Sequence, residues 1–196
     1  MKKWGKASSY GMVHACFNFA LDFIAKEADR KLLRKRLEAY ELRKGKHWPI
    51  PNVWIGVSVE DQKRADERVP LIARMPAAVR FLSCEPLIGE VDIDFTDAKN
   101  RDAYGRPIDW VIIGGESGPG ARPFNIEWAR QLIERGQEID GVAIFMKQLG
   151  ASVFEDEWDN ERSMSYPKVY KLEDKKGGNM DEWPYESLKV RDFPQG

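Results

Sequence analysis

Cysteine is scarce in this sequence. Only Cys16 and Cys84 occur among the 196 residues, and they form neither a CxxC pair nor any other spacing typical of metal ligands. A disulfide framework and a zinc site are therefore not expected. Two isolated thiols are typical of proteins from the reducing cytosol, so the sequence predicts a cytoplasmic location.

Long hydrophobic runs and a net charge are missing as well. No apolar stretch reaches the ~18 residues that a transmembrane helix requires, so no membrane partner is expected. The apolar residues near the start are interrupted by His14, Asn18 and Asp22, which argues against a signal peptide. The formal net charge is −1, and a chain so close to neutral has no general attraction for nucleic acids.

The charge is nevertheless unevenly distributed along the chain. Residues 1–48 hold 12 Lys or Arg and 5 Asp or Glu, which gives this segment a local charge of +7. Apolar residues at steps of three or four predict a helix over residues 17–44, whose other faces are basic. Two interpretations stay open. The interleaved acidic residues favour a helix face that is simply solvated. The alternative is that the basic residues of segment 26–46 form a surface that binds nucleic acid.

Short apolar runs farther along the chain predict buried strands. They cover residues 53–57, 79–82, 110–113 and 142–146, and a shorter strand is expected over 91–93. After the first run, Ala65 and Val69 share one face of a polar segment, and Pro70 is expected to open a short helical piece that Pro76 closes. A helix with Asn125 at its N-cap is expected after the third long run.

Residues 151–196 differ from the rest because their apolar side chains are sparse. The sequence predicts an irregular tail that wraps the domain, with Trp158, Trp183 and Val190 as its anchors. A disordered tail is the alternative interpretation.

Polar side chains follow each of the four main apolar runs. Strands separated by helices or long connections predict a parallel sheet, and the carboxyl ends of parallel strands meet on one rim, where such folds bind ligands. A single polar residue after a strand means little, but four such ends in succession indicate a site. The predicted rim residues are Ser58, Glu60, Ser83, Glu85, Lys147 and Gln148.

The third run leads into a glycine-rich loop, GGESGPGAR, that carries Glu116 at its centre. Glycines let backbone N–H groups approach an anion, and the following helix adds positive potential. The loop matches neither GxxxxGK[ST] nor GxGxxG, and Glu116 would repel a phosphate. A zwitterion suits it better, with an amino group on Glu116 and a carboxylate on backbone N–H groups and Arg122. The binding residues are Gly114, Gly115, Glu116, Ser117 and Arg122; a plain tight turn capped by Glu116 is the alternative.

Five motifs in this sequence resemble a phage-borne family, labelled phage protein Gp-thirty-seven/Gp-sixty-eight and otherwise a domain of unknown function. The motifs are PNVWIGVSVED (51–61), AAVRFLSCEPLIGEVD (77–92), DWVIIGGESGPGARP (109–123), FMKQLG (145–150) and the closing GG…EWP…LKVRDFP (177–194). The family is similar to radical S-adenosylmethionine enzymes. The resemblance implies a partial or full (β/α) barrel, a [4Fe-4S] cluster on three cysteines near the amino end, and a GGE turn that holds the methionine amino group.

This chain departs from that pattern because the cysteine triad is missing, and the cluster needs soft thiolate ligands. We therefore expect an α/β fold of the carboxyl-terminal half only: a partial parallel (β/α) barrel, half of a TIM-like barrel, with an N-terminal helix and an irregular tail. The expected parts are a diverged leader with a basic amphipathic helix (1–48), the barrel core (49–150) and a tail packed on the core (151–196).

Three functions follow as hypotheses. The first is a truncated phage-type radical S-adenosylmethionine-like protein of unknown substrate. It would be inactive alone and completed by a second polypeptide or a homodimer, because a half-barrel leaves strand edges unpaired. The second is a phage accessory protein that binds nucleic acid through its basic helix. The third is a binder of S-adenosylmethionine or a nucleotide without redox chemistry. The sequence assigns no catalytic residue and no metal ligand.

Overall fold

The structure is a computed structural model that describes Pro49 and residues 52–102, 105, 107–159, 162 and 164–194. The chain divides into two compact units, one formed by Met1–Val53 with Met75–Ala78 and the other by Trp54–Arg74 with Val79–Gly196. Every helix and strand reported below belongs to the second unit. The helix predicted over 17–44, with its nucleic-acid alternative, lies outside the described residues. No helix within the described ranges is both long enough and apolar enough for a membrane span.

Four parallel strands form the central sheet in the order β1-β2-β3-β5. Their bounds are β1 Trp54–Ser58, β2 Val79–Cys84, β3 Trp110–Gly114 and β5 Ala143–Gln148. The parallel sheet predicted from the four apolar runs is confirmed. Each strand continues past its apolar run, so that Ser58, Ser83, Lys147 and Gln148 lie in the carboxyl-terminal ends of the strands rather than in loops. Within the described residues β1 and β5 do not pair, so the sheet is open and not a closed barrel.

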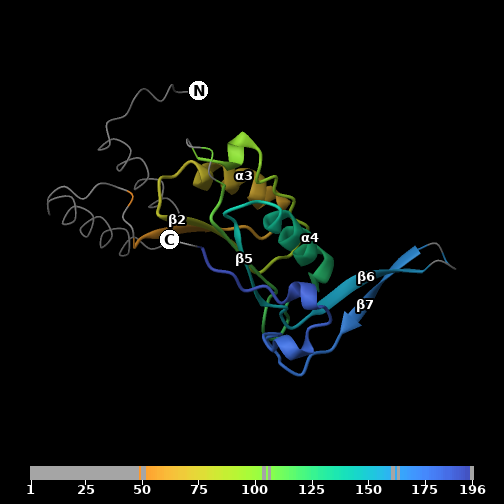
Figure 1. The fold of residues 1–196 in the computed structure, drawn as a ribbon. Coiled ribbons are helices and arrows are strands. Elements are labelled where there is room, and N and C mark those ends of the chain that lie inside the picture. Colours follow the sequence, from red (N-terminus) through yellow and green to blue (C-terminus); the bar gives the residue numbers. More distant parts are fainter. Residues whose placement is uncertain are drawn as a thin grey trace. The chain divides into compact units, whose positions relative to one another are not determined.

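Two helices connect the strands, and Figure 1 shows them with the sheet. Helix α3 (Gln62–Ala73) begins at Asp61, whose side chain accepts a hydrogen bond from the backbone N–H of Arg64. Helix α4 (Ile126–Gln137) begins at Asn125, whose side chain accepts from Glu127 N, which confirms the predicted N-cap. The prediction that Pro70 opens a separate helical piece was wrong, because Pro70 lies inside α3. A proline removes one backbone hydrogen bond there, and the packing of Ala65, Val69 and Ile72 in the core holds the helix together.

The sheet has two different faces. Alternate residues of β2, β3 and β5 are buried with the inner sides of α3 and α4 in one core; they are Leu82, Cys84, Val111, Ile113, Ile144 and Met146. The opposite face carries aromatic rings, of which Trp110 contacts Trp54, Phe81 and Phe145 at centroid distances of 5.8–6.0 Å. The prediction that the first strand is buried on both faces was wrong, since the residues of β1 alternate between exposed and half-buried.

Among its described residues, the connection between β2 and β3 contains one short 3-10 helix, η1 (Ala98–Asn100). The strand predicted over 91–93 is absent from it, although Val91, Ile93 and Phe95 are all buried. Their alternation therefore reflects an extended segment that packs its apolar side chains on the core without a neighbouring strand to pair with.

The prediction of an irregular tail was wrong for its first half. Strands β6 (Val153–Asp159) and β7 (Met164–Tyr170) form an antiparallel hairpin, and β6 also pairs in parallel with β4 (Phe124–Asn125). Figure 1 shows the hairpin extending away from the sheet. Trp158 is 60% exposed on it and is not an anchor.

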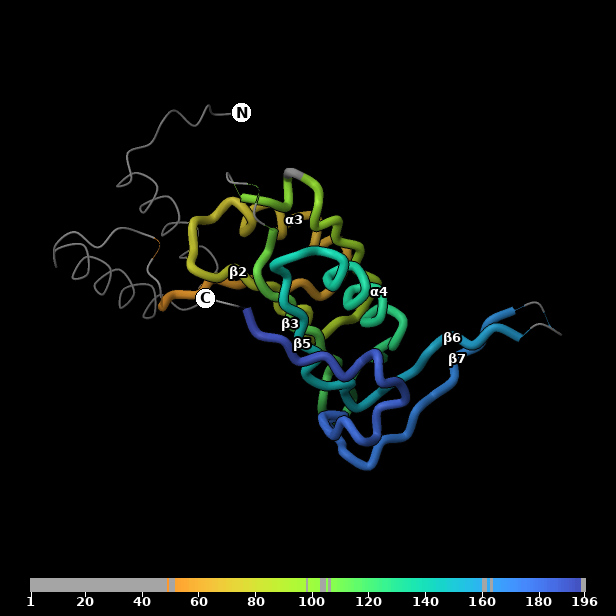
Figure 2. The backbone as a smooth tube through the Cα atoms, viewed as in Figure 1, coloured from red at the N-terminus to blue at the C-terminus, as the bar shows by residue number. Residues whose placement is uncertain are grey.

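The last residues of the chain return to the sheet. After the short helices η2 (Met180–Glu182) and η3 (Glu186–Leu188), the backbone of residues 190–192 runs beside β5, as Figure 2 shows. Met146 N donates to Val190 O at 2.8 Å, and Asp192 N donates to Ile144 O at 2.8 Å. Trp183 is buried, which confirms it as an anchor, and its indole N–H donates to Gly177 O at 2.9 Å. The outer edge of β5 is thus partly paired by the tail.

Candidate functional site at the strand ends

The register of the sheet brings the carboxyl ends of its strands together. Ser58 of β1 pairs with Ser83 of β2, and Cys84 pairs with Ile113 of β3. Glu60 and Glu85 each stand two residues after the paired serines, so both carboxylates leave the sheet at the same level. The acidic residues predicted for the rim therefore share one end of the sheet.

An irregularity in β5 directs Lys147 toward Glu85. The pairing of β3 with β5 shifts between Ile113 and Gly114, because Gly114 pairs with Gln148 and Lys147 is left over. Such a bulge turns a side chain away from its regular direction. Lys147 Nζ lies 2.8 Å from Glu85 Oε1 and 3.0 Å from Oε2. The Glu85 side chain crosses β3 at Gly114, where a Cβ would lie 3.2 Å from Glu85 Cγ.

Glu60 has a partner that the sequence did not indicate. Arg68 of α3 donates from Nη1 to Ser58 O at 2.7 Å and to Glu60 Oε2 at 3.1 Å. Ile88 N donates to Glu60 O at 2.9 Å, so the backbone after β1 is also tied to the segment after β2. Nothing in the spacing of Glu60 and Arg68 signals this pair, which depends on how α3 folds back along β1.

The glycine loop carries the third ion pair of the rim. Arg122 Nε lies 2.6 Å from Glu116 Oε2, Nη2 lies 3.2 Å from Oε1, and Arg122 N also donates to Oε2 at 3.0 Å. Hydrogen bonds from the Arg122 side chain and backbone lower the pKa of the Glu116 carboxyl below its usual value. The same contact raises the pKa of Arg122, and the charge of Glu60 adds a smaller contribution. Ser117 is exposed on this loop.

Close backbone packing fixes the position of the glycine loop. A Cβ on Gly115 would lie 2.1 Å from Leu149 O, and one on Gly150 would lie 2.6 Å from Glu116 O. Gly115 N donates to Gln148 O at 3.0 Å, while the Gln148 side-chain amide donates to Gly115 O at 3.0 Å. The glycines of the GGE and QLG motifs are therefore required because two strand-end backbones touch there.

The donor set of the described residues does not fit an iron–sulfur cluster. Cys84 is the only cysteine among them, and it is completely buried between the sheet and the helices. Burial raises the pKa of its thiol to about 12, and the charge of Glu60 adds to this effect. A cluster needs several thiolates that it can reach. Within the described part of the chain, no three His, Cys, Asp or Glu side chains form a group suited to a metal ion. Cys16 lies outside the described residues.

The structure divides the predicted residues among four contacts rather than joining them in one cluster. Glu60 meets Arg68, Glu85 meets Lys147 above Gly114, Gln148 holds Gly115, and Glu116 meets Arg122. Each rim glutamate is neutralised by a basic side chain: Glu60 by Arg68, Glu85 by Lys147 and Glu116 by Arg122. The rim is thus a row of ion pairs, which suits a ligand that carries both charges better than it suits a simple anion or cation.

Comparison with known proteins gives a family but no activity. A family model described as "Protein of unknown function (DUF5131)" matches residues 14–186. The match includes the basic segment, the sheet and the hairpin. A search of curated proteins found no match. A search of solved structures also found no match.

Proposed function

Because the chain belongs to the DUF5131 family of proteins of unknown function, its activity has to be inferred from the rim, and we propose that the rim binds a small zwitterion of the S-adenosylmethionine type. The observation that carries the proposal is the Glu116–Arg122 pair, held on a glycine loop at the carboxyl end of β3. Parallel sheets bind ligands at this end of their strands.

The pair can exchange its partners with a zwitterion. An α-amino group would take the place of Arg122 on the Glu116 carboxylate, and the α-carboxylate would accept from the freed guanidinium, which offers two parallel donors. Glu116 and Arg122 are 33% and 51% exposed, and an ion pair so open to water contributes little by itself. A ligand therefore loses little when it separates the two side chains and gains two charged contacts.

The topology supports a partial (β/α) barrel as the finer description of the fold. Four parallel strands follow one another in sequence order across the sheet, and both helices pack on the same face. The aromatic face of β1, β2, β3 and β5 would correspond to a barrel interior, which is filled by large side chains. A second polypeptide or a second copy of this chain would complete such a barrel. The proposed location is the cytosol, because two isolated cysteines agree with a cytosolic protein.

The resemblance to phage proteins and to radical enzymes leads to the same ligand. S-Adenosylmethionine, when bound, supplies an electrophilic sulfonium and an adenosyl group. In this chain Glu116, Arg122 and the backbone of the glycine loop would hold its methionine end. Since the described residues do not fit the cluster, we propose binding without reductive cleavage by this chain alone.

The test is isothermal titration calorimetry of the full chain with S-adenosylmethionine, repeated with Glu116→Gln. We expect binding that weakens about tenfold or more in the variant, because one charged hydrogen-bond partner is lost. Glu186→Gln serves as the matched control: Glu186 forms a similar exposed pair with Lys189 in the tail, so its removal should leave binding unchanged.

Two results would overturn the proposal. One is the absence of any heat or thermal shift at millimolar S-adenosylmethionine. The other is equal binding by the wild type and Glu116→Gln, which would place the ligand elsewhere on the molecule.

A further inference from the structure

The two peptide units on either side of Glu116 are both held by the turn after β5. Gly115 O accepts from the side-chain amide of Gln148 at 3.0 Å, and Glu116 O accepts from Ala151 N at 2.8 Å. Gly150 packs against the first of these units, because a Cβ there would lie 2.8 Å from Gly115 C and 2.9 Å from Glu116 N. Two successive carbonyls of the glycine loop are therefore directed toward the same turn.

The directions of these carbonyls determine where the neighbouring N–H groups point. Both peptide units are trans, and in a trans unit the C=O and the N–H of the next residue point in opposite directions. The N–H groups of Glu116 and Ser117 are therefore both directed away from the turn after β5. Within the described part of the chain neither N–H group donates a hydrogen bond, and Ser117 is exposed. The loop thus presents two successive backbone donors on the side opposite to the turn.

Successive backbone donors on one side of a chain suit an anion. The first of the two donors belongs to Glu116, the residue whose carboxylate takes the amino group in the function proposed above. In an α-amino acid the amino group and the carboxylate are separated by one carbon atom, so both can meet the backbone and the side chain of the same residue. A carboxylate has two oxygens, so the N–H pair and the Arg122 guanidinium can share it.

We propose that Gln148 is a positioning residue of the rim, which holds Gly115 O and thereby aims the Glu116 N–H at the α-carboxylate of the bound zwitterion. The Ala151 N–H has the same role for the N–H of Ser117. The inference rests on the proposed function, and it narrows the ligand class to molecules with a free carboxylate next to the amino group. A ligand without this carboxylate leaves both backbone donors unused.

The test compares S-adenosylmethionine with its decarboxylated form, which keeps the sulfonium, the adenosyl group and the amine. In calorimetry the wild-type full chain should prefer the ligand with the carboxylate about tenfold or more, because charge-assisted hydrogen bonds are lost without it. In the ¹⁵N-labelled chain, S-adenosylmethionine should shift the amide proton signals of Glu116 and Ser117 downfield as they bind the carboxylate. The decarboxylated ligand should leave both signals nearly unshifted.

Gln148→Met separates the positioning role from a structural one. The variant keeps the length of the side chain but removes the amide that holds Gly115 O. We expect the preference for the carboxylate to fall about fivefold, while affinity for the decarboxylated ligand stays within about twofold. The shift of the Glu116 amide signal should become smaller in this variant.

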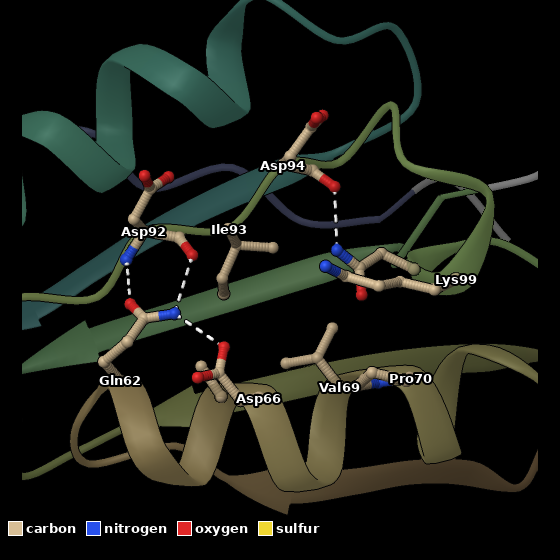
Figure 3. A pocket seen from close by; sticks show the side chains of 10 residues that line it. Gln62, Asp66, Val69, Pro70, Asp92, Ile93, Asp94 and Lys99 are labelled. Atoms are coloured by element: carbon tan, nitrogen blue, oxygen red, sulfur yellow. Dashed lines mark hydrogen bonds between the residues drawn. The ribbon is translucent and has the colours of Figure 1, made fainter.

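Gln62→Met is the matched control. The Gln62 amide also binds a backbone, since it donates to Asp92 O at 3.1 Å and accepts from Asp92 N at 2.6 Å. Figure 3 shows it in the groove between α3 and the connection after β2, which no rim residue lines. The substitution therefore removes a comparable contact away from the glycine loop and should leave the preference for the carboxylate unchanged.

The outcomes distinguish this inference from the proposed function. If the wild type binds neither ligand, both are overturned. If it binds the two ligands equally, or binds S-adenosylmethionine without a shift at Glu116 and Ser117, only the inference is overturned. An equal loss of affinity for both ligands in Gln148→Met would overturn it as well, because Gln148 would then support the fold without aiming a donor at the carboxylate.

Discussion

Replacing Arg80 with methionine is expected to destabilise the fold strongly without touching the rim. Arg80 is 1% exposed near the start of β2, at the opposite end of the strand from Glu85. Its guanidinium donates to Asp109 Oδ2 at 3.0 Å, to Ala73 O at 2.9 Å and to Pro107 O at 2.9 Å. The side chain therefore ties the end of α3 and the start of β3 to β2.

The size of the loss follows from what the substitution leaves behind. Three hydrogen bonds from a charged donor would contribute about 1.5–3 kcal/mol each if taken alone. In the variant, Asp109 Oδ2 still accepts a hydrogen bond from the backbone N–H of residue 80, which is at 2.7 Å in the wild type. Asp109 is also 23% exposed, so its carboxylate keeps both a donor and contact with water. The carbonyls of Ala73 and Pro107 lose this donor, and the Asp102 carboxylate, which is 8% exposed and lies 3.5 Å from Arg80 Nη1, loses its buried cation. We expect a loss of about 3–5 kcal/mol, the range for breaking a buried ion pair from one side.

Urea unfolding followed by tryptophan fluorescence measures this loss. Arg74→Met is the matched control, because Arg74 is exposed at the end of α3, and its substitution should change stability by less than about 0.5 kcal/mol. A loss below about 1 kcal/mol in Arg80→Met would refute the reasoning, since the buried donor network would then contribute almost nothing. Binding of S-adenosylmethionine at low temperature should be kept in both variants.

Three further predictions concern the glycine loop, the thiol and acid stability. Gly115→Ala should lower stability by about 1–3 kcal/mol through a backbone clash, whereas Gly89→Ala, which meets only one atom at 3.6 Å, should be neutral; equal melting temperatures would contradict this. In a Cys16→Ser background, native Cys84 should react with a thiol reagent at pH 8 roughly a thousandfold more slowly than in urea, because its raised pKa of about 12 leaves little thiolate; fast labelling of the native protein would contradict it. Backbone hydrogen bonds lower the pKa of the Asp174 carboxyl. Its ionised form therefore stabilises the fold fully above about pH 4, and this stabilisation is lost as the pH falls through the folded pKa. The melting temperature of Asp174→Asn should depend less on pH in acid than that of the wild type, and an unchanged slope would refute the assignment.

The parallel sheet was predictable because its signal is local. An apolar run between polar segments identifies a strand, and Asn125 before an apolar-periodic stretch identifies the start of α4. The hairpin was missed because β6 and β7 have little apolar face. β7 is exposed along almost its whole length, and β6 carries Glu155, Asp156 and Glu157, so the two strands leave no alternation of buried and exposed residues in the sequence.

The candidate site was predictable in membership but not in pairing. The order of strands places Glu60, Glu85 and Lys147 at one end of the sheet, which follows from parallel topology. That Lys147 reaches Glu85 depends on a shift in register between β3 and β5, and that Glu60 meets Arg68 depends on the course of α3.

The tail is part of the site rather than a wrapper around the domain. Leu149 N donates to Gly177 O at 2.9 Å and Gly150 N donates to Lys176 O at 3.1 Å, so the tail backbone holds the turn after β5. The turn after β5 packs against Gly115, and Ala151 N donates to Glu116 O at 2.8 Å. Trp183 closes this chain of contacts by binding Gly177 O from a buried position. The position of the Glu116 carboxylate therefore depends on three backbone segments that are far apart in the sequence, and the glycines at 115, 150 and 177 are the residues that let those segments touch.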